Sequence, residues 1–234
     1  NLQPDAMPTF KSNTSAIVKS PRGENDWRVS LSVPPIMKGM PKTLLQPLVN
    51  TNNRMVFPFT PSIIFSHSAS YNALQPTHTN YPFYNYQSSA VDAITIAGDF
   101  FVENNIDAQY WISAVTYLRT VTKMFYGNGA NVGNPPPIIK LNGYGEFVFN
   151  EVPCVVTSFN IDLPQDVDYI KAVMDSTESS DPFGDPTTIS GPATWVPSQS
   201  LISVTVQPIY SRATQSEFNL NDFVSGDLIT RGII

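Results

Sequence analysis

The sequence predicts a mainly β fold, a β-sandwich or open barrel of six to eight strands with one flanking amphipathic α-helix and long loops. Three observations support this prediction. Several short segments alternate apolar and polar residues, as half-buried strands do. One stretch repeats apolar residues every three or four positions, which is typical of one helix face. Charged residues make up only 14% of the 234 residues, and 21 prolines interrupt the chain.

The composition excludes several classes of protein. Hydrophobic residues make up 41% and aromatic residues 12% of the chain, whereas disordered chains have few aromatics and many charges. A coiled coil would need a Glu, Lys and Leu periodicity that is missing. No apolar run approaches the roughly 20 residues of a membrane-spanning helix, so no membrane partner is expected. Few charges and many aromatics favour a β protein with much of its surface against other protein.

The strands expected before the helix are short alternating runs that end at Pro or Gly. They are predicted at 27–33, 55–57, 62–66 and 93–102. Residues 1–26 are interpreted as an N-terminal arm, since they are rich in Pro, Ser, Thr and Asn. Residues 69–89 are interpreted as an aromatic, polar connection. Gly98, inside the longest run, is expected to mark a β-bulge.

One amphipathic helix is predicted over 107–125. Asn105 or Asp107 is expected to cap its start, and Gly127 is expected to end it. The side chains expected in the core form a stripe at helical spacing: Trp111, Val115, Leu118, Thr122 and Phe125.

After the helix, further strands complete a β domain over 27–210. They are predicted at 138–141, 146–149, 155–161 and 200–210. Asn142-Gly143 is expected to form a hairpin turn, and Pro208 suits an edge strand. Residues 164–199 are interpreted as a long acidic, Pro-rich insertion. The C-terminal tail, 211–234, has apolar residues but little regular pattern, so it is expected to dock on a neighbour.

The formal net charge of −6 is unevenly distributed. Residues 1–150 hold ten Lys and Arg against eight acids, whereas residues 151–234 hold three against eleven. No basic patch stands out, which disfavours stable binding of nucleic acid. The acids expected to face a partner or a channel lie in the insertion: Asp166, Asp168, Asp175, Glu178, Asp181 and Asp185.

No motif for catalysis, cofactor binding or metal binding is present, so no enzyme activity and no cofactor are expected. His67 and His78 are interpreted as hydrogen-bonded loop histidines. Cys154, the single cysteine, follows the pattern of a buried strand residue and not of a nucleophile. An aromatic run is expected to form a protein interface, since it lacks the interleaved Lys or Arg of a base-stacking surface. It comprises Tyr81, Phe83, Tyr84 and Tyr86.

The block of 95 residues from Pro76 to Ile170 resembles the tail-tube-like baseplate proteins of contractile-tailed phages, especially the T4-like and cyanophage group. The ends of the chain resemble them poorly. The resemblance rests on several motifs taken together. These are PTHTNYPF at 76–83, the strand 94–102, LRTVTKMFYG at 118–127, PPP at 135–137, LNGYG at 141–145 and LPQDVDYI at 163–170.

The resemblance implies two packed sheets with a flanking helix, and a homohexameric ring whose sheet edges pair between subunits. Such rings join the baseplate hub to the tail tube, as a tube initiator or cap, and DNA passes through the lumen. The expected partners are therefore other copies of the chain, a hub protein, and a tail-tube or second initiator protein. The expected location is the virion, after assembly in the host cytoplasm. Two alternatives are the major tail-tube subunit and a carbohydrate-binding β-sandwich at the tail tip that uses Tyr81 to Tyr86.

Overall fold

The computed structural model describes residues 27–37, 44–126, 133–174 and 193–234. The fold is mainly β, as predicted, and it is built on an open seven-stranded antiparallel sheet that does not close into a barrel. The strand order is β2-β1-β7-β8-β11-β6-β3. The strands of this sheet are β1 (Ser30–Ser32), β2 (Arg54–Val56), β3 (Ser62–Ile64), β6 (Ile94–Phe101), β7 (Ile139–Gly143), β8 (Phe149–Ile161) and β11 (Gln199–Pro208).

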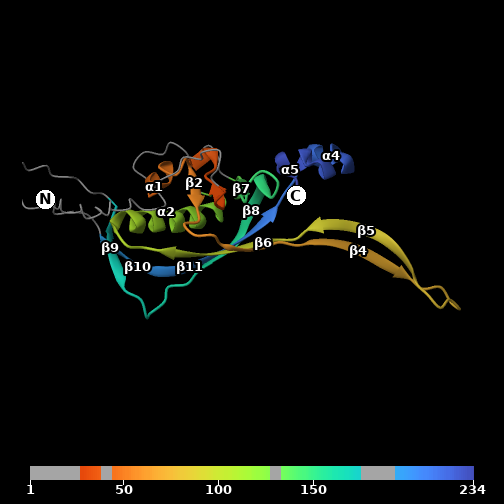
Figure 1. The fold of residues 1–234 in the computed structure, drawn as a ribbon, viewed down its shortest axis with the longest axis horizontal. Helices are drawn as coiled ribbons and strands as arrows, with labels where there is room; N and C mark the ends of the chain where they lie inside the picture. Colours follow the sequence, from red (N-terminus) through yellow and green to blue (C-terminus); the bar gives the residue numbers. More distant parts are fainter. Residues whose placement is uncertain (1–26, 38–43, 127–132, 175–192) are drawn as a thin grey trace, which may run out of the picture.

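Two hairpins and several helices complete the described part of the chain (Figure 1). The hairpins are β4 (His67–Leu74) with β5 (Phe83–Val91), and β9 (Tyr169–Val173) with β10 (Ala193–Pro197). The long helix is α2, Asn105–Val121. The short helices are η1 (Pro35–Met37), α1 (Gln46–Val49), α3 (Arg212–Ser216), α4 (Leu220–Ser225) and α5 (Asp227–Thr230).

Helix α2 covers one face of the sheet, and the core lies between them. Leu118 is fully buried, and Trp111 and Val115 are buried beside it. Two aromatic side chains of the same helix donate hydrogen bonds to the sheet, one to its backbone and one to a serine side chain. Tyr117 donates to the Ser32 carbonyl over 2.8 Å, and the Trp111 indole donates to Ser200 Oγ over 2.8 Å. The predicted role of the helix as a cover for the sheet is therefore confirmed.

The predicted ends of the helix were wrong by a few residues. The N-cap is Asn104, whose side chain accepts from the amides of Ile106 and Asp107. At the other end Thr122 is the C-cap and is only part-buried. Phe125, also part-buried, leaves the helix because its backbone pairs with Gly133 and Asn134 instead. Gly127 lies outside the described residues.

The turn predicted at Asn142-Gly143 and the separate strands predicted after it also differ from the structure. Asn142 and Gly143 belong to β7, and the turn follows at Tyr144 and Gly145, with φ of 57° and 93°. Residues 146–148 continue that turn, and β8 runs without a break from Phe149 to Ile161. Gly143 serves close packing and not a turn, because a Cβ at this position would lie 3.0 Å from Val29 Cγ2.

Gly98 forms no bulge, since β6 pairs with β11 in one unbroken register from Ile94 to Phe101. Its role is close packing, because a Cβ at this position would lie 2.6 Å from Phe57 Cδ1. Pro208 is not on an edge strand either. It is the last residue of β11, a central strand, where it lies opposite Cys154 at the sheet end and beyond the pairing with β6.

Three segments expected to be irregular contain regular structure. Residues 69–89 fall in the β4–β5 hairpin, which projects from the body of the molecule (Figure 1). The insertion 164–199 supplies β9 and β10, and Ala172 and Val196 of that hairpin are fully buried in the core. The tail 211–234 forms three short helices.

Candidate functional site: the exposed hairpin and the sheet edges

The β4–β5 hairpin has almost no cover from the rest of the described chain. Every residue of β4 is exposed, and in β5 only Val91 is part-buried. From Met55 to Val91 the sequence runs for 37 residues without an Asp, Glu, Lys or Arg. An isolated two-stranded hairpin is marginally stable in water. A ribbon with neither a core nor charges is therefore a surface that another molecule is expected to cover.

The hairpin presents aromatic side chains on both faces. Tyr71 lies opposite Tyr86 with ring centroids 5.7 Å apart, and Ala73 lies opposite Tyr84 on the same face. The pair of Leu74 and Phe83 lies on the other face, because side chains alternate along a strand. The Phe83 and Tyr84 side chains are 62% and 66% exposed. These residues offer contact area without charge.

The two edges of the main sheet differ in how their backbone groups are satisfied. At β2, the Tyr110 hydroxyl accepts from the Val56 amide over 2.7 Å and donates to the Val56 carbonyl over 2.8 Å. Thr51 donates to the Arg54 carbonyl over 2.5 Å. Burial raises the pKa of the Tyr110 phenol, so it stays a neutral donor and acceptor. This edge is closed within the chain.

The opposite edge is long and open. Strand β3 ends the sheet order, and β4 continues it along the hairpin. Ile64, on β3, is 69% exposed. Among the described strands none pairs with the outer side of β3 or β4. An exposed, uncharged edge of this kind is a template for pairing with another chain.

An open apolar groove of about 370 Å³ lies between the hairpin base and the C-terminal helices. Its walls include Ser68, Ala69, Ser89, Ala90, Phe218 and Phe223. The C-terminal wall is fixed on the body, because Asn150 Nδ2 donates to the Thr230 carbonyl and Leu228 is buried. The tail therefore docks partly on its own chain, while Leu220 and Val224 stay exposed.

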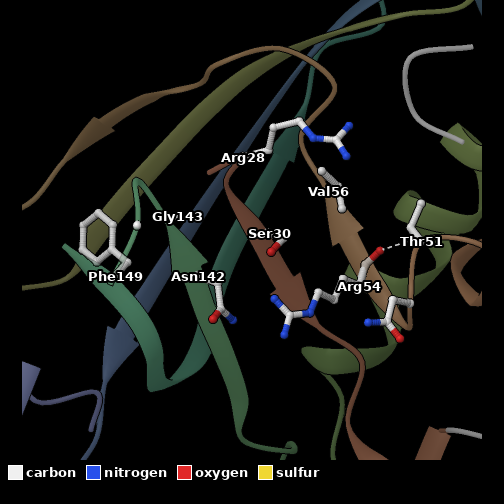
Figure 2. Close-up of a pocket in the computed structure, with 10 residues that line it drawn as sticks. Arg28, Ser30, Thr51, Arg54, Val56, Asn142, Gly143 and Phe149 are labelled. Carbon is white, nitrogen blue, oxygen red and sulfur yellow. Dashed lines mark hydrogen bonds between the residues drawn. The ribbon is translucent and has the colours of Figure 1, made fainter. Parts of the chain in front are cut away.

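A second, small pocket lies over β2, β1 and β7 (Figure 2). Arg28, Ser30, Arg54 and Asn142 line it. Asn142 accepts from the Glu151 amide through Oδ1, while its buried Nδ2 has no hydrogen-bond partner. The volume of about 30 Å³ is room for roughly two water molecules. Its lining holds no nucleophile beside a base, so it defines no acyl-transfer or hydrolytic site.

The residues considered for chemistry are dispersed. His67 begins β4 beside the Phe65 ring, and His78 lies in the turn between β4 and β5 with φ of 64°. Cys154 is fully buried, as expected, and burial raises the pKa of its thiol to about 12. Within the described ranges, no group of three His, Cys, Asp or Glu side chains could hold a metal ion.

The acidic candidates are only partly described. Asp166 and Asp168 are exposed in the loop before β9, while Asp175, Glu178, Asp181 and Asp185 lie outside the described residues. No helix among the described residues is long and apolar enough to cross a membrane.

No protein-family model matches the chain, and no curated protein matches it. The sequence analysis predicted an interface at Tyr81 and the β5 aromatics, which stays a prediction, and it did not predict β4, the open edge or the groove residues Phe218 and Phe223. One signal could have revealed the hairpin. It is the 37-residue run without charge, in which serines, small residues and aromatics alternate on either side of the Pro76–Pro82 turn.

Proposed function

We propose that the chain is a structural subunit of a contractile phage tail. Six copies form a ring that joins the baseplate hub to the tail tube and initiates tube assembly, and the protein has no catalytic role. The observation that carries the proposal is the uncharged β4–β5 hairpin, in which every residue but Val91 is exposed. The resemblance of residues 76–170 to tail-tube-like baseplate proteins supplies the biological setting.

The contact area of the hairpin supports a protein partner. A buried aromatic side chain covers about 150–250 Å². Tyr71, Phe83, Tyr84 and Tyr86 are each 58–66% exposed, so together they offer on the order of 500 Å² for burial. A standard interface buries about 800 Å² on each partner. These four side chains alone would supply more than half of one.

The contrast between the two sheet edges supports ring formation. Closing the β2 edge inside the chain leaves the β3–β4 edge for a neighbour, and the contact is heterologous when this edge meets a different surface of the next copy. A heterologous contact of this kind closes into a ring when the rotation between copies allows it. Exposed acids such as Asp166 and Asp168, if they face the lumen of the ring, would let DNA pass without sticking.

A reconstruction of the native tail particle tests the proposal directly. The expected result is one ring, or two, of this chain between the hub and the tube. Many stacked rings would instead identify the major tail-tube subunit. Absence of the chain from the particle, together with a purified protein that stays monomeric, would overturn the proposal.

A second candidate function is carbohydrate binding, since Tyr71, Tyr84 and Tyr86 share one face of the hairpin. Exposed aromatic rings in a row can stack on sugars. Glycan-array binding that is lost in Tyr84→Ala, but kept in Tyr126→Ala, would favour this function. Tyr126 is a suitable control because it is 90% exposed and belongs to the segment after α2, not to the hairpin.

A further inference from the structure

The groove at the hairpin base and the tip of the same hairpin are matched in chemistry. The groove and the adjoining hollow, which Tyr210, Thr214 and Gln215 line, contain no Asp, Glu, Lys or Arg side chain, although His67 lines the groove and Ile234 lines both. The tip, from Gln75 to Tyr84, also has none. A strongly charged partner would leave its charges desolvated in this groove. An uncharged, aromatic segment fits it better.

The turn at the tip is formed within a single copy of the chain. Thr79 Oγ1 donates to the Pro76 carbonyl over 2.9 Å, which holds the turn together. Tyr81 is 82% exposed at this turn, with Phe83 and Tyr84 directly after it. Because the turn is already formed, inserting it into a groove would order few additional torsions.

The tip of a copy lies too far from its own groove to fill it. Eight residues of β4 span roughly 26 Å at about 3.3 Å per residue. Figure 1 shows the ribbon leading away from the C-terminal helices. Only another molecule can bring a tip to this groove.

We infer that the hairpin tip of one copy inserts into the groove at the hairpin base of the next copy, between β4–β5 and the C-terminal helices. Tyr81, Phe83 and Tyr84 pack against Ala69, Phe218 and Phe223 of the neighbour. The hairpin tip of one copy and the groove of the next are different surfaces, so the contact is heterologous and propagates around a ring. This inference rests on the proposed ring and names the contact that builds it.

Disulfide cross-linking of the full chain tests the contact. The variant Tyr81→Cys/Ala69→Cys carries one cysteine at the tip and one in the groove. The native Cys154 is fully buried, so it stays out of the reaction. The expected product under mild oxidation is a ladder of covalent oligomers that ends at the ring size. The matched control is Tyr81→Cys/Thr194→Cys, because Thr194 is exposed on β10 at the opposite end of the molecule (Figure 1), and it should give no ladder.

A second pair of variants measures association without cysteines. Phe218→Ser in the groove should weaken self-association at least tenfold by mass photometry, while Trp195→Ser, on β10, should leave it unchanged. Rings seen by electron microscopy with no ladder and normal Phe218→Ser association would overturn the inference but leave the ring intact. A ladder that stops at the dimer would overturn the head-to-tail arrangement. A wild-type chain that forms no ring and is absent from tail particles would overturn both proposals.

Discussion

The two halves of one β-ribbon have opposite environments. Strands β3 and β6 form its first half inside the main sheet, and β4 and β5 form its second half beyond the body, with only two residues between β5 and β6. Ile94 and Ile96 of β6 are fully buried, whereas Tyr84 and Tyr86 of β5 are about 60% exposed. Both halves are largely apolar or uncharged, with Asp99 on β6 as the one Asp, Glu, Lys or Arg of the four strands, so composition separates them little. What separates them is cover, because β11 pairs with β6 and the β6 side chains lie in the core together with those of α2, whereas the described part of the chain gives β4 and β5 almost no cover.

The largest expected effect comes from placing a charge in the covered half of the molecule. Leu118→Asp should prevent folding, since Leu118 is fully buried under the sheet and a buried, unpaired carboxylate destabilises by several kcal/mol. Circular dichroism and thermal unfolding measure the loss. The matched variant Phe83→Asp puts the same charge on the exposed half. It should fold with an unchanged Tm but fail to assemble, and a folded Leu118→Asp protein would show that α2 is not the cover.

The next effect concerns the closed edge. Tyr110→Phe removes the hydroxyl that both accepts from and donates to Val56, which leaves a buried amide and carbonyl without a partner. The expected loss is about 1–3 kcal/mol of the free energy of unfolding, measured with denaturant. Tyr117→Phe is the control, because its hydroxyl makes a single bond, to the Ser32 carbonyl, and it should lose less. An equal loss of unfolding free energy in both variants would mean that the two hydrogen bonds at the β2 edge stabilise the fold no more than the single bond of Tyr117.

These contrasts also explain how far the sequence could predict the structure. The spacing of Trp111, Val115 and Leu118 predicted the helix and its buried face, because periodicity records which side is covered. The cap at Asn104 was missed by one residue, since Asn104, Asn105 and Asp107 are all good N-caps and only the backbone chooses between them. The hairpin was missed for a different reason. Its strands have no buried face within the chain, so the alternation that reveals a half-buried strand is weak there.

The candidate site shows the same limit. The aromatic run of β5 was predicted to be an interface from composition alone. The groove could not be predicted, because Ala69 and Phe218 are brought together only when the C-terminal segment docks on β8 and the hairpin base. Gly98 is a similar case, because its contact is with Phe57, 41 positions earlier in the chain.

A smaller effect is expected from alkaline pH on the covered core. Burial raises the pKa of Cys154 from 9.0 to about 12, so the folded chain keeps a proton that the unfolded chain loses. Stability from this group is complete below pH 9 and is lost as the pH rises toward 12. Cys154→Ala should therefore reduce the decline of the unfolding free energy between pH 9 and 10 without abolishing it, since burial also raises the pKa of Tyr110, Tyr117 and Tyr210. A decline of the same slope in wild type and variant would show that the thiol is not protected.

The smallest effect is expected from the charges on the surface of the body. Lys140 Nζ and Glu151 Oε2 are 2.8 Å apart, with the two side chains 52% and 46% exposed. An exposed pair of this kind contributes about 0–1 kcal/mol, so Lys140→Ala should change the free energy of unfolding by less than about 1 kcal/mol. The change should shrink further in 1 M salt, where the Debye length is about 3 Å. Self-association should not change, since Lys140 lies on β7 and not on the ribbon. A Lys140→Ala protein that no longer assembles would place the assembly surface on the body and not on the uncharged hairpin.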